Sequence, residues 1–163
     1  MAVFVADEQT RPIDVEHLRR LADFVLADRG VPASMDLSIL CVDTGAIAAL
    51  NAHHLGADGP TDVLAFPMDL PGESGPGEPS ILGDVVLCPE IAAEQAARQG
   101  NTPEAELELL VAHGILHLLG HDHAEPEERD VMLGLTDRLL AEFRTARPEP
   151  AAGGGVEIDV EAP

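Results

Sequence analysis

The sequence HGILHLLGHDH occupies residues 113–123 and guides the interpretation of the whole chain. His113 and His117 are four positions apart, so on an α-helix their rings project from the same face, one turn apart. Gly120 follows three residues later, where a chain can leave a helix through a left-handed backbone conformation. Such a turn directs His123 back toward the two rings. The pattern therefore predicts a helix that ends near Gly120 and brings three imidazoles together.

Three converging imidazoles indicate a metal site. Three protein ligands with one open position are typical of catalytic zinc, whereas structural zinc sites are closed. A single His in an apolar helix is more often an ordinary core or surface residue, but three imidazoles among leucines are costly unless a partner satisfies them. His121 competes as a ligand, and the spacing after Gly120 favours His123. We expect one Zn²⁺ per chain at His113, His117 and His123, although three imidazoles also accept nickel, cobalt or copper.

The residue after the first histidine separates two kinds of chemistry. Metzincin proteases have the same H-x3-H-x2-G-x2-H frame, but they place a Glu directly after the first His as general base. This chain has Gly114 at that position. Zinc would still lower the pKa of a water toward 7. The sequence therefore favours a hydrolase whose base lies elsewhere over a peptidase.

Hydrophobic periodicity and turn residues around this helix predict the remaining elements. Asp43 is placed to cap a helix, Pro89 and Gly100 bound another, and Thr102 and Glu106 form a near capping arrangement. The elements mix without strict alternation, which is typical of the α+β class. We expect a small mixed four-stranded sheet packed with about five helices. The expected strands are 2–6, 37–42, 62–66 and 81–88, and the expected helices are 13–27, 44–53, 89–99, 102–119 and 126–143.

Length and composition fit one compact domain. The chain has 163 residues, 45% of them hydrophobic, and contains no Trp or Tyr, so aliphatic side chains must fill the core. We assign residues 1–144 to a metal-dependent hydrolase domain. Residues 145–163, rich in Pro, Gly and acidic side chains, lack a core-forming pattern and are predicted to be a disordered tail.

The charge is strongly negative. Thirty acidic residues stand against nine basic ones, giving a net charge of −21, and every basic residue is Arg. Such a surface repels phosphate backbones, so composition alone argues against a nucleic-acid partner. No apolar run is long enough to span a membrane, and no secretory signal is recognisable, which predicts a cytoplasmic protein without a membrane partner. Cys41 and Cys88 each end an apolar strand and are predicted to be buried thiols.

Three segments in order resemble the YbeY family of zinc-dependent rRNA maturation factors. They are HGILHLLGHDH, GPTDVLAFP (59–67), with Ala65 where the family has Ser, and LGDVVLCPE (82–90). The resemblance covers residues 2–143. It implies a zincin-like fold with the HxxxH helix against the sheet, and zinc ligands at His113, His117 and His123. It also implies a single-strand-specific endoribonuclease that acts in rRNA 3′-end maturation and ribosome quality control, with small-subunit ribosomal proteins as further partners.

Two departures from the family pattern concern the substrate. The family commonly has Asn followed by Arg in N-x3-R, whereas Asn51 is followed at that spacing by Leu55, which removes a bidentate phosphate clamp. The residue before the Asp-His pair, commonly Tyr, is His121. We expect His121 to act in catalysis as a cation or proton donor. Asp122 either orients a ligand histidine or stabilises the turn.

Other polar residues receive smaller roles. Asp84, inside an apolar strand, either caps a neighbouring backbone or borders the cleft. Thr61 and Asp62 are expected to hold the preceding loop, and the alternative is that they line the site. The remaining expectations are solvated ion pairs for Arg129 and Arg138, at most a peripheral role for His53 and His54, and a surface position for His17.

Two other functions remain open at this stage. A zinc peptidase requires a carboxylate near the metal, from Asp84 or Asp122. A non-catalytic ribosome-assembly factor that keeps zinc for stability is suggested by Leu55 in place of the Arg.

Overall fold

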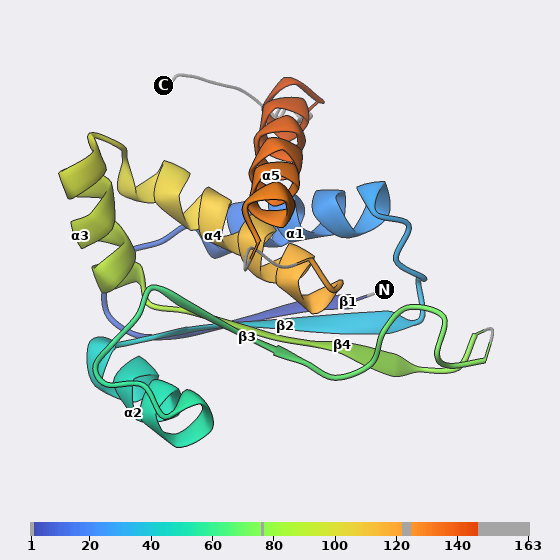
Figure 1. The fold of residues 1–163 in the computed structure, drawn as a ribbon, viewed down its shortest axis with the longest axis horizontal. Helices are drawn as coiled ribbons and strands as arrows, with labels where there is room; N and C mark the ends of the chain where they lie inside the picture. Colours follow the sequence, from blue (N-terminus) through green and yellow to red (C-terminus); the bar gives the residue numbers. More distant parts are fainter. Residues whose placement is uncertain (1, 76, 122–124, 147–163) are drawn as a thin grey trace.

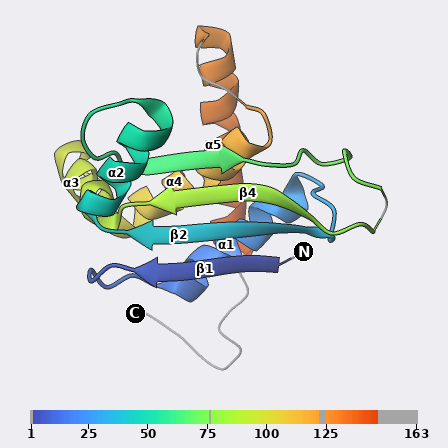
Figure 2. The same ribbon diagram turned by 90° about the horizontal axis from the view of Figure 1, so that it is seen from below.

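The computed structural model describes residues 2–75, 77–121 and 125–146, which form four strands and five helices around one mixed sheet. The sheet order is β1–β2–β4–β3; β1, β2 and β4 are parallel, and β3 runs antiparallel to β4 (Figure 2). This confirms the predicted α+β class. The strands are β1 (Ala2–Glu8), β2 (Met35–Val42), β3 (Val63–Pro67) and β4 (Ser80–Leu87); the helices are α1 (Val15–Asp28), α2 (Thr44–Leu55), α3 (Pro89–Gln99), α4 (Pro103–Leu118) and α5 (Pro126–Ala146).

Helices cover the two faces of the sheet unequally. Helices α1, α4 and α5 lie over one face, and α2 lies against the other (Figure 1). Alternate strand residues face the two sides: Ile39 and Val85 pack into the larger core under α4, and Val86 packs with Ile47 of α2 in a smaller one. Helix α4 is therefore enclosed between the sheet and the outer helices, and most of its residues are buried.

The ends of α4 are set by the residues that the sequence singled out. The Thr102 side chain accepts a hydrogen bond from the backbone N–H of Ala105 at 3.1 Å, which caps the first turn. At the other end Gly120 adopts a φ of 99°, and the N–H groups of Gly120 and His121 donate to the carbonyls of His117 and Leu116. The predicted left-handed exit at Gly120 is confirmed.

Helix α4 lies tightly against the sheet at Gly114. A Cβ atom built at this buried glycine would lie 2.8 Å from Cγ1 of Val85 on β4. Because real Cβ atoms do not approach other carbons so closely, any larger side chain would push the helix off the strand. Gly114 therefore sets the height of the two histidines above the sheet.

The observed elements differ from the predicted ones mainly at their ends. Helix α5 continues through Thr145 and Ala146, the first residues that we assigned to the tail. Residues 147–163 lie outside the described part, and their disorder stays a prediction. Among the described residues, no helix has both the length and the apolar character that a membrane span requires.

Both cysteines are buried free thiols, as predicted. Burial, with a smaller contribution from Asp7, raises the pKa of Cys41 to about 12. Burial also raises the pKa of Cys88 above its usual value. Because the thiolate is the reactive form, we expect both side chains to be inert packing residues.

Candidate active site

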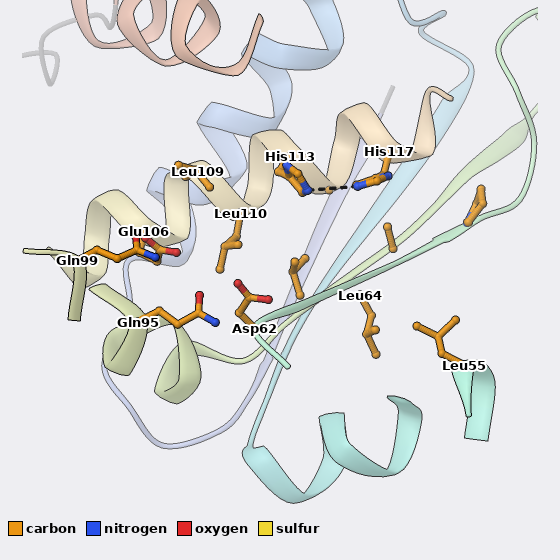
Figure 3. Close-up of a pocket in the computed structure, with 14 residues that line it drawn as sticks. Leu55, Asp62, Leu64, Gln95, Gln99, Glu106, Leu109, Leu110, His113 and His117 are labelled. Atoms are coloured by element: carbon orange, nitrogen blue, oxygen red, sulfur yellow. Dashed lines mark hydrogen bonds between the residues drawn. The ribbon is translucent and has the colours of Figure 1, made fainter. Parts of the chain in front are cut away.

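A cleft of about 610 Å³ lies between α4, the neighbouring strand β3 and helix α3, with the end of α2 at its mouth (Figure 3). His113, Gly114 and His117 line it from α4, and Asp62, Val63 and Leu64 line it from β3 and the residue before it. The volume is in the range of small-molecule sites. We refer to this space as the cleft.

The two histidines of α4 converge inside the cleft. Nε2 of His113 lies 3.2 Å from Nε2 of His117, and both rings are half-buried (Figure 3). Two imidazoles that bind one tetrahedral zinc at the usual bond length have their nitrogens about 3.3 Å apart. The same separation also suits a hydrogen bond between a protonated and an unprotonated ring nitrogen. The pair thus fits two of the predicted metal ligands.

The other predicted site residues fall in different places. His123 and Asp122 lie outside the described residues, so their roles stay predictions. His121 is half-buried, and it lines a separate cavity of about 280 Å³ with Glu127, Glu128 and Val131. Its catalytic role also stays a prediction.

The end of the cleft near α3 is polar. Gln95 and Gln99 reach it from α3, Glu106 from the first turns of α4, and Asp62 from the start of β3 (Figure 3). Glu106 is only 4% exposed, and its Oε1 accepts a long hydrogen bond of 3.4 Å from Asn101 Nδ2. The near capping arrangement predicted for Glu106 is thus replaced by this bond. Asp62, for which a loop-holding role was expected with a place in the site as the alternative, lines the cleft and accepts a hydrogen bond from Thr61.

The mouth of the cleft carries Leu55, which is 63% exposed. Asn51, one turn earlier on α2, is buried and donates from Nδ2 to the carbonyl of Gly59 at 3.0 Å, so it holds the loop that leads to β3. None of the described residues that line the cleft is an Arg or a Lys. The cleft therefore lacks a cation for a substrate phosphate within the described residues.

No carboxylate occupies the position of the peptidase base. That position is Gly114, and Val85 leaves no room there for a side chain. Asp84 is next to Val85 on β4, and since neighbouring strand residues face opposite sides, Asp84 lies on the face away from α4. It is not among the residues that line the cleft, and within the described residues its side chain makes no hydrogen bond. The expected position at the cleft is therefore wrong, and a backbone-capping role stays a prediction.

The remaining sequence predictions concern residues away from the cleft. Arg138 forms the expected ion pairs, with Asp28 at 3.3 Å and Glu142 at 2.9 Å. His53 and His54 are exposed at the end of α2 and do not line the cleft. The surface position predicted for His17 is wrong. Its Nε2 lies 2.6 Å from Oε2 of Glu108, and its side chain is only 16% exposed.

Glu108 joins three helices. Besides His17 on α1, it accepts a hydrogen bond of 2.5 Å from Nη2 of Arg144 on α5. Burial would raise the pKa of Glu108, but the hydrogen bonds from His17 and Arg144 outweigh burial and hold that pKa below its ordinary value. Sequence reasoning missed this network as well as Glu106. The available signal was the pair of carboxylates in ELELL (106–110), at positions that the apolar pattern of α4 buries.

The comparisons with known proteins agree on one family. A family model described as Endoribonuclease YbeY matches residues 4–144. A protein of Salinispora tropica named Endoribonuclease YbeY is 47% identical over 90% of this chain and 99% of its own length. A protein of a Nocardioides species with the same name is 49% identical over 88% of this chain and 99% of its own length. A Thermotoga maritima protein solved in solution superposes with a TM-score of 0.56 at 28% identity, over 89% of this chain and 93% of its own.

Proposed function

The chain belongs to the YbeY endoribonuclease family, and from that premise we propose that it hydrolyses phosphodiester bonds of single-stranded rRNA in the cleft, with zinc as cofactor. The observation that carries the proposal is the approach of Nε2 of His113 to Nε2 of His117 at 3.2 Å on the wall of the cleft. Two imidazoles so arranged on one helix suit a shared metal ion.

The metal would be held by His113 and His117 with His123 as the third ligand. The histidine-only donor set fits zinc in a site that leaves one coordination position open. When bound, zinc supplies Lewis acidity and lowers the pKa of a coordinated water toward 7. The zincin-like character of the fold is part of the same proposal.

The residues of the cleft then have separate tasks. Val63, Leu64, Leu109 and Leu110 provide apolar walls that limit the access of water to the reacting bond. Gly114, by bringing α4 onto β4, keeps the two histidines close to the sheet on the wall of the cleft. For the proton transfers we propose His121 as donor, and for ligand orientation Asp122.

Charge restricts how the RNA is bound. With a net charge of −21 and no Arg or Lys among the described residues of the cleft, phosphate contacts supply little affinity. We therefore propose that small-subunit ribosomal proteins contribute to docking, and that the enzyme acts in rRNA 3′-end maturation and ribosome quality control in the cytoplasm.

A non-catalytic, zinc-stabilised assembly factor is a second candidate, because exposed Leu55 stands at the cleft mouth where an Arg would clamp phosphate. The zinc peptidase is less well supported. The contact of Gly114 with Val85 leaves no space for its general base, and Asp84 faces away.

Cleavage assays separate these functions. The purified chain is incubated with a single-stranded rRNA 3′ segment and with the same segment in a duplex, with zinc and after chelation. We expect cleavage of the single strand alone, lost on chelation. In cells, a His117→Ala variant should accumulate unprocessed rRNA 3′ ends, and a matched His53→Ala variant should not. Cleavage that persists after chelation would contradict the proposal, and chelation that only lowers the melting temperature of an inactive protein would favour the assembly factor.

A further inference from the structure

The polar end of the cleft carries carboxylate and amide side chains that take no part in the proposed metal site. Glu106 lies seven positions before His113, which is two helical turns, so both side chains are on the same face of α4, about 10 Å apart along the axis. Figure 3 places Asp62, Gln95, Gln99 and Glu106 together at this end, away from the two histidines. A substrate bound at the histidines can therefore reach this group.

Glu106 is a buried carboxylate with spare hydrogen-bonding capacity. It is only 4% exposed, and its one hydrogen bond within the described residues is the long one from Asn101 to Oε1. No cationic side chain of the described part neutralises it. A buried carboxylate with a single long hydrogen bond is costly, so its position on the wall of an open cleft suggests that a ligand supplies further donors.

The lining of this end of the cleft favours neither a metal ion nor a phosphate as the partner of Glu106. Among the residues that the structure describes, no group of three or more His, Cys, Asp or Glu side chains can hold a metal ion. Asp62 and Glu106 would repel a phosphate, and no Arg or Lys of the described part lines the cleft to offset that repulsion. A neutral ligand rich in N–H donors fits instead.

We propose that this end of the cleft is a guanine subsite, which holds a base next to the scissile bond of the RNA; this inference rests on the function proposed above. Guanine offers two adjacent donors, N1–H and N2–H₂, on its Watson–Crick edge, and they match the two oxygens of the Glu106 carboxylate. Single-stranded RNA exposes this edge to side chains. The amide of Gln95 donates to O6 of the base, and Val63 and Leu110 cover its faces.

The subsite explains how an acidic cleft can take RNA. Carboxylates repel the phosphate backbone but attract base donors, so recognition shifts from the backbone to the base edge. Adenine and cytosine each present a ring acceptor beside one amino donor. That ring acceptor would face a carboxylate oxygen, which is unfavourable. Selection for guanine therefore follows from the charge of Glu106 and not only from the shape of the cleft.

Nucleoside binding tests the proposal without any cleavage step. Guanosine, inosine, adenosine and cytidine are titrated into the zinc-loaded full-length protein by NMR or calorimetry. Inosine lacks the N2 amino group, so guanosine should bind about 5- to 150-fold more tightly than inosine, the range of a good bidentate base contact. Equal affinities for guanosine and inosine would overturn the proposal.

Variants distinguish recognition from a structural effect. Glu106→Gln replaces one of the two acceptors that face N1–H and N2–H₂ of guanine with a donor, so the advantage of guanosine over inosine should be lost. Glu94→Gln, the same change at an exposed position of α3, should keep the guanosine preference. If Glu106→Gln lowers the melting temperature, Gln95→Leu is the second test, and it should weaken guanosine binding severalfold. A Glu106→Gln protein that still binds guanosine more tightly than inosine, by the same factor as the unmodified protein, would contradict the proposal.

Cleavage mapping separates this inference from the proposed function. On single-stranded RNAs of mixed sequence we expect cuts at a fixed distance from guanosines and loss of that preference in Glu106→Gln. RNA cut without base preference overturns the guanine subsite and leaves the nuclease intact. Guanosine selectivity in a protein that cuts no RNA supports the subsite while the proposed nuclease function fails.

Discussion

Glu106 and Glu108 lie two residues apart on α4, and both are buried, at 4% and 7% exposure. Glu108 points between helices α1 and α5, where His17 and Arg144 satisfy both of its oxygens. Glu106 points to the cleft, and within the described residues its carboxylate accepts one long hydrogen bond, from Asn101. Burial thus does not distinguish the two carboxylates, but their partners do. We infer that α4 has two sides. On the structural side, protein groups compensate the charge of Glu108. On the functional side, Glu106 and the two histidines face the cleft, where a ligand can bind.

The largest expected effect is on the functional side. Replacing His113 by Ala removes one of the two converging nitrogens, and we expect the rate of RNA cleavage to fall at least about 100-fold, since even outer partners of metal ligands are worth 10- to 100-fold. The rate is measured on a single-stranded rRNA segment with saturating zinc. His53→Ala, an exposed histidine outside the cleft, is the control. Full activity in the His113→Ala protein would mean that His113 has no part in catalysis and that the functional side of α4 is wrongly assigned.

The next largest effect is on stability and concerns Glu108, on the structural side of α4. Glu108→Ala should lower the free energy of unfolding by about 1–3 kcal/mol, because it leaves His17 and Arg144 without their acceptor. The half-exposed Arg144 can regain water, which keeps the loss in this range. Glu106→Gln should cost less than about 1 kcal/mol, since the amide oxygen keeps the Asn101 bond. Urea denaturation measures the free energy of unfolding of both variants. Equal losses would mean that the two carboxylates contribute equally to stability, which would contradict the distinction between them.

Acid should weaken the structural side through Glu108. The pKa of Glu108 is lowered in the folded protein because hydrogen bonds from His17 and Arg144 outweigh burial. A carboxyl group with a lowered folded pKa adds stability above its unfolded pKa and loses it as the pH falls through the folded value. The stability of the unmodified protein should therefore fall more steeply below about pH 4.5 than that of Glu108→Gln. Parallel curves of melting temperature against pH would contradict this assignment.

The smallest expected effect is a gain. Leu55→Arg places a cation at the mouth of the cleft. On the structural side of α4, Glu108 already has such a cationic partner in Arg144. We expect RNA affinity to rise about three- to tenfold, and the dependence of log K on log salt to steepen by about 0.7 for one added phosphate contact. Fluorescence anisotropy at several salt concentrations measures both quantities. A gain in affinity with an unchanged salt dependence would show that the introduced guanidinium packs against the RNA and does not pair with phosphate.

Much of the fold could be predicted because local signals agreed with tertiary packing. Thr102 and Gly120 bound α4 as expected, and Asp43 caps α2, accepting from the N–H of Ala46 at 2.8 Å. Element ends moved by one to three residues, as in α5, because the last turn of a helix is decided by contacts and not by periodicity. The order of the strands in the sheet is also a property of packing that no local signal carries.

The candidate site was only half predictable for a related reason. The positions of His113 and His117 follow from helical spacing, which a sequence displays directly. Glu106, Gln95 and Asp62 meet only because α3, α4 and β3 converge, so no spacing rule connects them. His17 was misplaced since its partner Glu108 is far along the chain.

The metal content of the purified protein tests the central claim most directly. The full-length chain is expressed with zinc, dialysed, and analysed by mass spectrometry of its metals, beside His117→Ala and His53→Ala. We predict one zinc per chain in the unmodified protein and in His53→Ala, and almost none in His117→Ala. A folded chain that retains no zinc, or a His117→Ala protein that retains all of it, would contradict the claim that the converging histidines of α4 form a metal site.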